Sequence, residues 1–172
     1  MISKLTTAPA LLVSVNDMKG YLKLDTAVDD ALLTTMIKSA IEDIEIYLNR
    51  KLNPQTWTTY YEMYNKEMEH KYPDGRLELP YEPVKSITSV KNETGAVVSY
   101  RTLYTFPTSI ELSYIPSESI VIVAEYGYDS GKLPDRLILA VKELTAQYYE
   151  YRCSSIPDEI KIKINSFRVI RI

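Results

Sequence analysis

Reactive residues are scarce in this chain of 172 residues, which has one cysteine and one histidine. It cannot form an internal disulfide, and it cannot supply the usual ligand set of a zinc site. With five glycines and 45% hydrophobic residues, it is neither collagen-like nor fully disordered. The apolar run near the N-terminus, residues 10–13, is too short for a signal peptide or a membrane span. We therefore expect a soluble, intracellular protein with no membrane partner.

The chain also lacks an excess of positive charge, since the net charge is −3 and the isoelectric point is about 5.3. This balance argues against a protein that grips nucleic acid over its whole surface. The aromatic residues are 15 Tyr, 2 Phe and 1 Trp. Tyrosine suits half-buried surfaces that meet other proteins, but it also favours ordinary strands, and the sequence leaves both interpretations open.

Apolar residues recur at steps of three and four in three segments, which predicts helices over residues 15–22, 28–49 and 134–152. Ser14 and Asp17 form a potential capping pair before the first helix. Pro134 suits the first turn of the last helix. Leu144 on that helix and Trp57 are expected in the core.

Between residues 55 and 128 the period changes to two, which predicts strands separated by turns. The expected short strands cover residues 77–79, 84–91, 96–100, 109–112 and 120–126. Turns are expected at residues 73–75 and 92–95, and a polar loop at residues 65–71. The strand at 120–126 is almost wholly apolar, so it should lie in the middle of a sheet.

The C-terminal residues also alternate, and from Ile160 onward they include two Lys and two Arg but no acid. This pattern predicts an extended docking tail that adds as a strand to a partner, with its charges facing an acidic rim. Contact with nucleic-acid phosphates is the alternative, but it gives no reason to place isoleucines on one face. The predicted docking residues are Ile160, Ile162, Ile164, Phe167, Arg168, Val169, Arg171 and Ile172.

Taken together, the segments predict an α+β fold: a small helical bundle of two long helices and a short one, with an inserted antiparallel β-sheet and an extended C-terminal tail. The expected organisation is an extended N-terminal arm over residues 1–13, a single domain over 14–153, and the docking tail over 154–172.

No arrangement of residues suggests catalysis or cofactor binding. His70 lies in a polar stretch, and Cys153 follows the last helix with no second cysteine or histidine near it in the sequence. Glycine-rich phosphate loops are missing. The carboxylates of Glu42, Asp43 and Glu45 are interpreted as part of the solvent-exposed face of a helix rather than as an acid/base pair. We therefore predict a protein that is not an enzyme, with no catalytic, metal-binding or cofactor-binding residue.

Several motifs occur in an order that is characteristic of one family. Residues 15–24 read VNDMKGYLKL, residues 29–33 read DDALL, and residues 55–57 read QTW. The most specific piece is LELP at 77–80 followed by PVKSITSV at 83–90. Residues 124–128 (AEYGY), 133–140 (LPDRLILA) and 148–152 (YYEYR) complete the series. In this order and spacing, the chain resembles the head–tail connector (adaptor) proteins of tailed bacteriophages.

This resemblance implies a structural protein of the virion neck that is made in the host cytoplasm. Members of the family form a ring, commonly of twelve copies, between the portal protein and the next neck or tail protein. Packaged DNA passes through the central channel without sequence-specific binding, and an acidic bore would not trap it. The C-terminal segment typically reaches toward the portal, which agrees with a docking tail.

Two other functions are also compatible with the sequence. One is another ring of the same neck, a stopper or tail-completion protein, which would be mainly β. The other is a small intracellular enzyme or ligand-binding domain. The neighbouring residues Tyr148, Tyr149 and Tyr151 cannot all point inward from one helix, so we expect them to be divided between core and interface.

Overall fold

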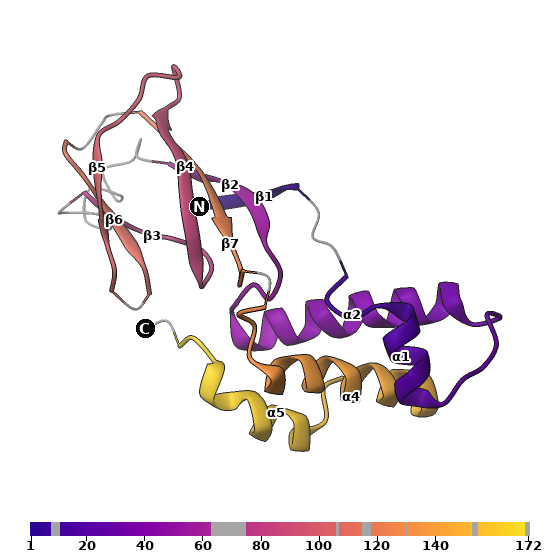
Figure 1. Cartoon of the computed structure of the whole chain (residues 1–172). Helices are drawn as coiled ribbons and strands as arrows, with labels where there is room; N and C mark the ends of the chain where they lie inside the picture. Colours follow the sequence, from indigo (N-terminus) through magenta and orange to yellow (C-terminus); the bar gives the residue numbers. More distant parts are fainter. Residues whose placement is uncertain are drawn as a thin grey trace. The chain divides into compact units, whose positions relative to one another are not determined.

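The computed structural model describes residues 1–7, 11–62, 75–105, 107–114, 118–129, 131–152 and 155–170. The chain forms two compact units (Figure 1). The sheet unit contains Met1–Pro9 and Pro54–Tyr128, and the helical unit contains Ala10–Asn53 and Asp129–Ile170. The α+β class predicted from the sequence is confirmed.

The described residues of the helical unit form four α-helices and one 3₁₀ turn. They are α1 (Val15–Leu22), α2 (Asp30–Leu48), α4 (Asp135–Tyr151), α5 (Asp158–Ile164) and η1 (Asn165–Phe167). Helices α2 and α4 pack along each other, and α5 packs on α4 (Figure 1). In the described part of the chain, no helix has the length and apolar character needed to cross a membrane.

The core of this unit follows the apolar spacing in the sequence. Helix α2 buries Leu33, Ile37, Ala40, Ile41, Ile44 and Leu48, and α4 buries Leu137, Ala140, Val141, Leu144 and Tyr148. These positions repeat every three or four residues, so each helix turns one apolar stripe toward its neighbours. The expected core position of Leu144 is confirmed, because the side chain is fully buried.

Helix α1 begins with the capping pair predicted from the sequence. The Ser14 hydroxyl accepts a hydrogen bond from the Asp17 backbone N–H at 3.0 Å and donates one to the Asp17 carboxylate at 2.7 Å. The bond from Ser14 lowers the pKa of Asp17 below 3.8. A carboxylate in the first turn is also favoured by the helix dipole.

Ser14→Ala should destabilise the protein by about 1 kcal/mol, because it removes the cap. The loss should be largest well above pH 3.8 and should shrink as the pH falls through the lowered pKa of Asp17, since the protonated carboxyl has less to gain from the hydroxyl. Denaturant unfolding of wild type and variant at neutral and acidic pH measures this. Equal stability of the two proteins at neutral pH would contradict it.

The sheet unit holds a four-stranded antiparallel sheet in the order β1-β2-β7-β4 and a three-stranded one in the order β3-β6-β5. The strands are β1 (Ile2–Thr7), β2 (Gln55–Tyr61), β3 (Arg76–Glu78), β4 (Val84–Asn92), β5 (Tyr100–Leu103), β6 (Ser109–Leu112) and β7 (Ile120–Tyr126). Strand β1 lies within the predicted N-terminal arm.

Strand β7 lies between β2 and β4, which confirms the central place predicted for this apolar segment. Its residues alternate: Ile120, Ile122, Ala124 and Tyr126 are buried, and the residues between them are partly exposed. The buried set joins Leu77 and Leu79 and other apolar side chains in one core. Trp57 is partly buried and packs against this core, with its ring 4.8 Å from that of Tyr81.

The strand expected at residues 96–100 lies further along the chain. The turn at 92–95 forms as predicted, since Gly95 has a φ of +86° and its N–H donates to the Asn92 carbonyl. The Asn92 side chain then accepts the Ala96 N–H, which holds the first residue of the expected strand in the turn. A single bridge joins Lys91 to Val97, and the regular strand β5 begins at Tyr100.

The expectation of an extended C-terminal tail is wrong, because this segment forms α5. Pro157 precedes the helix, and Asp158 and Glu159 lie in its first turn. Lys161 and Lys163 lie in its last turn. The helix dipole stabilises negative charge at the first turn and positive charge at the last. Ile160 and Ile164 also fit a helix, because residues four positions apart lie on the same helix face. The turn at 73–75 and the loop at 65–71 lie outside the described residues, apart from Gly75.

Candidate interaction surfaces

The residues after α5 attach the C-terminal segment to the end of α2. Tyr47 donates a hydrogen bond to the Asn165 side chain at 3.2 Å, and the Arg168 guanidinium lies 5.2 Å from the centre of the Tyr47 ring. The Val169 N–H donates to the Leu48 carbonyl at 2.9 Å. That bond satisfies one of the backbone carbonyls left free at the C-terminus of a helix.

This attachment divides the eight predicted docking residues. Ile160, Ile164 and Val169 are buried in the helical unit, so their side chains are not available to a partner. Ile162 is exposed, as are Arg168 and Ile170, a residue not singled out in the sequence. Phe167 is half-buried, and Arg171 and Ile172 lie outside the described residues.

The three neighbouring tyrosines of α4 are divided as the helix geometry predicts. Tyr148 is buried and donates a hydrogen bond to the Asp43 carboxylate at 2.5 Å. Tyr149 is half-buried and donates to Asp29 at 2.6 Å; this bond raises the pKa of Tyr149, while nearby Arg152 partly opposes the shift. Tyr151 is exposed. Two of the tyrosines therefore tie α4 to α2 and to its N-cap, and the third is available for contact.

Tyr148→Phe should destabilise the protein by about 1.5 kcal/mol, because it removes a hydrogen bond to a charged group while leaving the ring in place. Tyr151→Phe is the matched control on the exposed side of the same helix, and its effect should lie within about 0.5 kcal/mol of zero. Denaturant unfolding of the three proteins measures the difference. Two variants of equal stability would show that the Tyr148 bond contributes nothing net.

Two open grooves lie on the surface of the helical unit. One, of about 410 Å³, lies between α2 and α4, and its lining includes Leu32, Met36, Asp43 and Tyr148. The other, of about 500 Å³, is lined by residues from α1, α4 and α5, including Glu143 and Lys163. Lys163 donates to both Glu143 oxygens at 2.9 Å, and this bond raises the pKa of the lysine.

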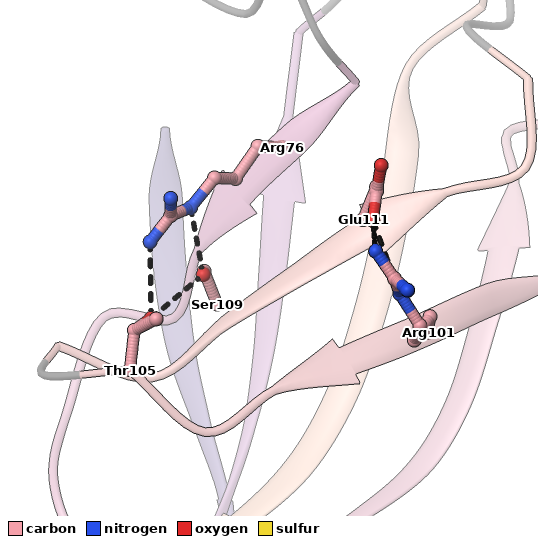
Figure 2. Close-up of polar contacts among 5 residues, drawn as sticks. All are labelled: Arg76, Arg101, Thr105, Ser109 and Glu111. Atoms are coloured by element: carbon pink, nitrogen blue, oxygen red, sulfur yellow. Dashed lines mark hydrogen bonds and ion pairs between the residues drawn. The ribbon is translucent and has the colours of Figure 1, made fainter.

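The outward row of the three-stranded sheet is charged. Arg76, Glu111 and Arg101 are cross-strand neighbours in the order β3-β6-β5. Figure 2 shows that Arg101 pairs with Glu111, whereas Arg76 turns away toward the hydroxyls of Ser109 and Thr105, at 2.9 and 3.0 Å. Exposed surface pairs of this kind contribute little to stability, so the row mainly keeps this face polar.

The outward face of the four-stranded sheet has a different character. Ile2, Tyr60 and Val121 are neighbours across β1, β2 and β7, and Ile2 and Tyr60 are exposed. The Lys85–Glu125 ion pair lies toward the other end of this face. Strand β1 buries none of its residues fully and forms one edge of the sheet. Such an edge, with apolar side chains beside it, is suited to contact with another protein.

The described residues bring together no group of three or more His, Cys, Asp or Glu side chains that could hold a metal ion. His70 and Cys153 lie outside the described residues. Glu45, one of the three acids considered in the sequence, is buried and accepts hydrogen bonds from the Leu52 N–H at 2.8 Å and from Lys51 at 3.0 Å. It closes the C-terminal end of α2, which is a structural role.

Two exposed aliphatic residues of the helices were not singled out in the sequence. Ile46 and Leu139 are 77% and 46% exposed, although each lies in a helix whose other apolar residues are largely buried. Both depart from the buried stripe by about half a helical turn. The departure could have been noticed on a helical projection, but nothing in the residue type distinguishes an interface isoleucine from a core one.

Comparisons with known proteins identify one matching family and several structures with a similar fold. A family model described as "Head completion protein" matches residues 11–158. A structure described as the neck of an empty GTA particle computed with C6 symmetry has a TM-score of 0.81 and 23% identity, covering 100% of this chain and 97% of that one. No curated protein matches.

Two further structures share the fold at 22% identity over 100% of this chain and 97% of theirs. One is the virion of a native gene transfer agent (GTA) particle, with a TM-score of 0.77. The other is the neck of a native GTA particle computed with C12 symmetry, with a TM-score of 0.78. At this level of identity, the similarity shows a shared fold.

Proposed function

Because this chain belongs to the head completion protein family, we propose that it is a structural protein of the virion neck that forms a ring between the portal and the lower neck or tail. The observation that carries this proposal is the family match over residues 11–158. The shared fold with proteins of particle necks supports it along the whole chain. The ring is the functional unit, and each copy contributes surfaces to it rather than reactive groups.

The ring has twelve copies in this proposal, in line with the C12 symmetry stated for one neck that shares the fold. A closed ring requires each copy to offer two different surfaces, one to each neighbour. We assign this role to the helical unit, where α2 and α4 are the longest helices. DNA passes through the central channel without base-specific contacts, and the net charge of −3 limits its retention there.

The portal protein and the next neck or tail protein are the proposed partners on the two sides of the ring. The C-terminal residues from Ile170 onward are proposed to reach the portal or an adjacent copy, because Val169 is bound to the end of α2 and Ile170, the next residue, is exposed. Exposed Ile170 followed by Arg171 and Ile172 combines apolar and basic side chains, which suits a partner surface with an acidic rim.

The four helices in the described part of the chain favour the adaptor ring over the mainly β alternative, a stopper or tail-completion protein. A monomeric enzyme or ligand-binding domain is disfavoured by the family match. Binding of a metabolite by the isolated chain, with no affinity for portal particles, would revive that alternative.

Production of particles from a genome that lacks the gene for this chain tests the proposal. We expect heads that contain the portal protein but do not join tails, and we expect tailed particles to return when the wild-type chain is supplied separately. A second deleted strain that receives an empty plasmid is the control. Normal tailed particles in the absence of the chain would overturn the proposed function.

A further inference from the structure

We propose that adjacent copies of this chain meet through an acidic surface on α2 of one copy and a basic surface on α4 of the next. The α2 patch consists of Glu42, Asp43 and Ile46, and the α4 patch consists of Arg136, Leu139 and Lys142. This inference rests on the proposed ring and goes beyond it by naming the two surfaces that join neighbours.

The α2 patch is an apolar side chain beside carboxylates. Ile46 is 77% exposed, and Glu42, which lies one turn before it, is also exposed. Asp43 lies three residues before Ile46, and among the described residues its carboxylate accepts a hydrogen bond only from the neutral hydroxyl of Tyr148, which does not cancel its charge. Lys38 lies one turn before Glu42 and forms no ion pair with the described residues. With Lys38 included, the surface keeps a net negative charge.

The α4 patch has the same form with the opposite sign. Leu139 is 46% exposed, and Arg136 and Lys142 lie three residues to either side of it. Asp135 is the nearest acid of the first turn. Glu143 is occupied by both of its bonds from Lys163. Lys142 lies near the Asp17 carboxylate of α1 and, in addition to the bond from Ser14, lowers its pKa, so these two charges offset each other. The positive charge beside Leu139 is therefore carried by Arg136, which is exposed and has no ion pair with any residue that the structure describes.

A second copy of the chain is the occupant that these charges select. One helical unit carries both an acidic and a basic surface, each built around an exposed aliphatic side chain. Two surfaces that differ and complement each other produce a head-to-tail contact, and repetition of that contact closes a ring. Placing Ile46 against Leu139 removes both from water, while the flanking charges set the register and exclude the like-charged arrangement.

Charge reversal on each side tests this pairing in particles. The variants are Glu42→Arg, Arg136→Glu, the two changes in one chain, and the two single variants supplied together. The measurement is the number of copies of the chain retained per purified particle. Each single variant should lower it by about tenfold or more, because every contact then joins like charges. The double variant should restore retention, and so should the mixture, since alternating copies in an even-numbered ring again pair opposite charges.

Asp25→Arg is the control, because it reverses an exposed charge of the helical unit that belongs to neither patch. It should leave retention unchanged, and circular dichroism should show all variants folded. Wild-type retention of both single variants would overturn the inference, and so would folded single variants that neither the double change nor the mixture rescues. Either result would leave the neck role intact, because that role is tested by particles that lack the chain altogether.

Discussion

Removal of residues 160–172 is expected to unfold the helical unit, whereas removal of residues 170–172 alone should leave the chain folded but unable to join portal particles. The longer deletion removes Ile160, Ile164 and Val169, which are buried, together with the hydrogen bond to the Leu48 carbonyl. Burial of three aliphatic side chains of this size contributes roughly 5 kcal/mol or more. That is a large part of the stability of a typical domain.

Circular dichroism and thermal unfolding measure the first effect, and co-sedimentation with portal particles measures the second. Replacement of residues 170–172 by three serines keeps the chain length. This matched control separates the effect of losing the side chains from the effect of shortening the chain. A folded and stable protein after the longer deletion would contradict the packing of α5. Wild-type binding to portal particles after the shorter deletion would show that the last residues have no docking role.

Ile122→Ala should destabilise the sheet unit by roughly 2–4 kcal/mol, because it leaves a cavity in the core that the surrounding strands cannot fill. Ile122 lies in the middle of β7, is fully buried, and has β2 on one side and β4 on the other. Because Ile122 is fully buried and has a neighbouring strand on each side, the loss of stability should be among the largest for a single aliphatic truncation in this unit.

Val123→Ala is the matched control, because Val123 is the next residue of the strand and its side chain lies on the opposite, partly exposed face. It should cost less than about 1 kcal/mol. Denaturant unfolding of the two variants measures the difference between the faces. Similar losses for both variants would contradict the register that directs Ile122 inward.

Helices α1, α2 and α4 and the central strand could be predicted because local periodicity and burial agree there. The apolar steps of α2 and α4 and the capping pair at Ser14 each specify one structure. The bounds of α1, β6 and β7 agree with the predicted ranges of 15–22, 109–112 and 120–126. The family match likewise confirms the resemblance drawn from the order of the motifs.

The tail was misread because its pattern fits two periods. Isoleucines at positions 160, 162 and 164 satisfy a strand, but Ile160 and Ile164 alone satisfy a helix face, and Ile162 is then exposed. Pro157 followed by two acids was the local signal that favours the helix. The attachment of Val169 to Leu48 could not be predicted, since it depends on two segments that are far apart in the chain.

The interaction surfaces were less predictable than the fold. The sequence pointed to eight docking residues in the tail, and the structure buries three of them. The docking role of the others remains a prediction. Exposed Ile46 and Leu139 lie about half a helical turn from the buried stripes, but the sequence alone does not show whether an aliphatic side chain at such a position is exposed or is covered by another element.

A three-dimensional reconstruction of the particle neck, made without imposed symmetry and with this chain carrying a recognisable tag, tests the central claim most directly. The account predicts a closed ring of twelve tagged copies around the DNA channel, directly below the portal, as the C12 symmetry stated for one neck of the same fold suggests. A neck that lacks the tag, or one in which the chain occurs as isolated copies that do not touch each other, would contradict it.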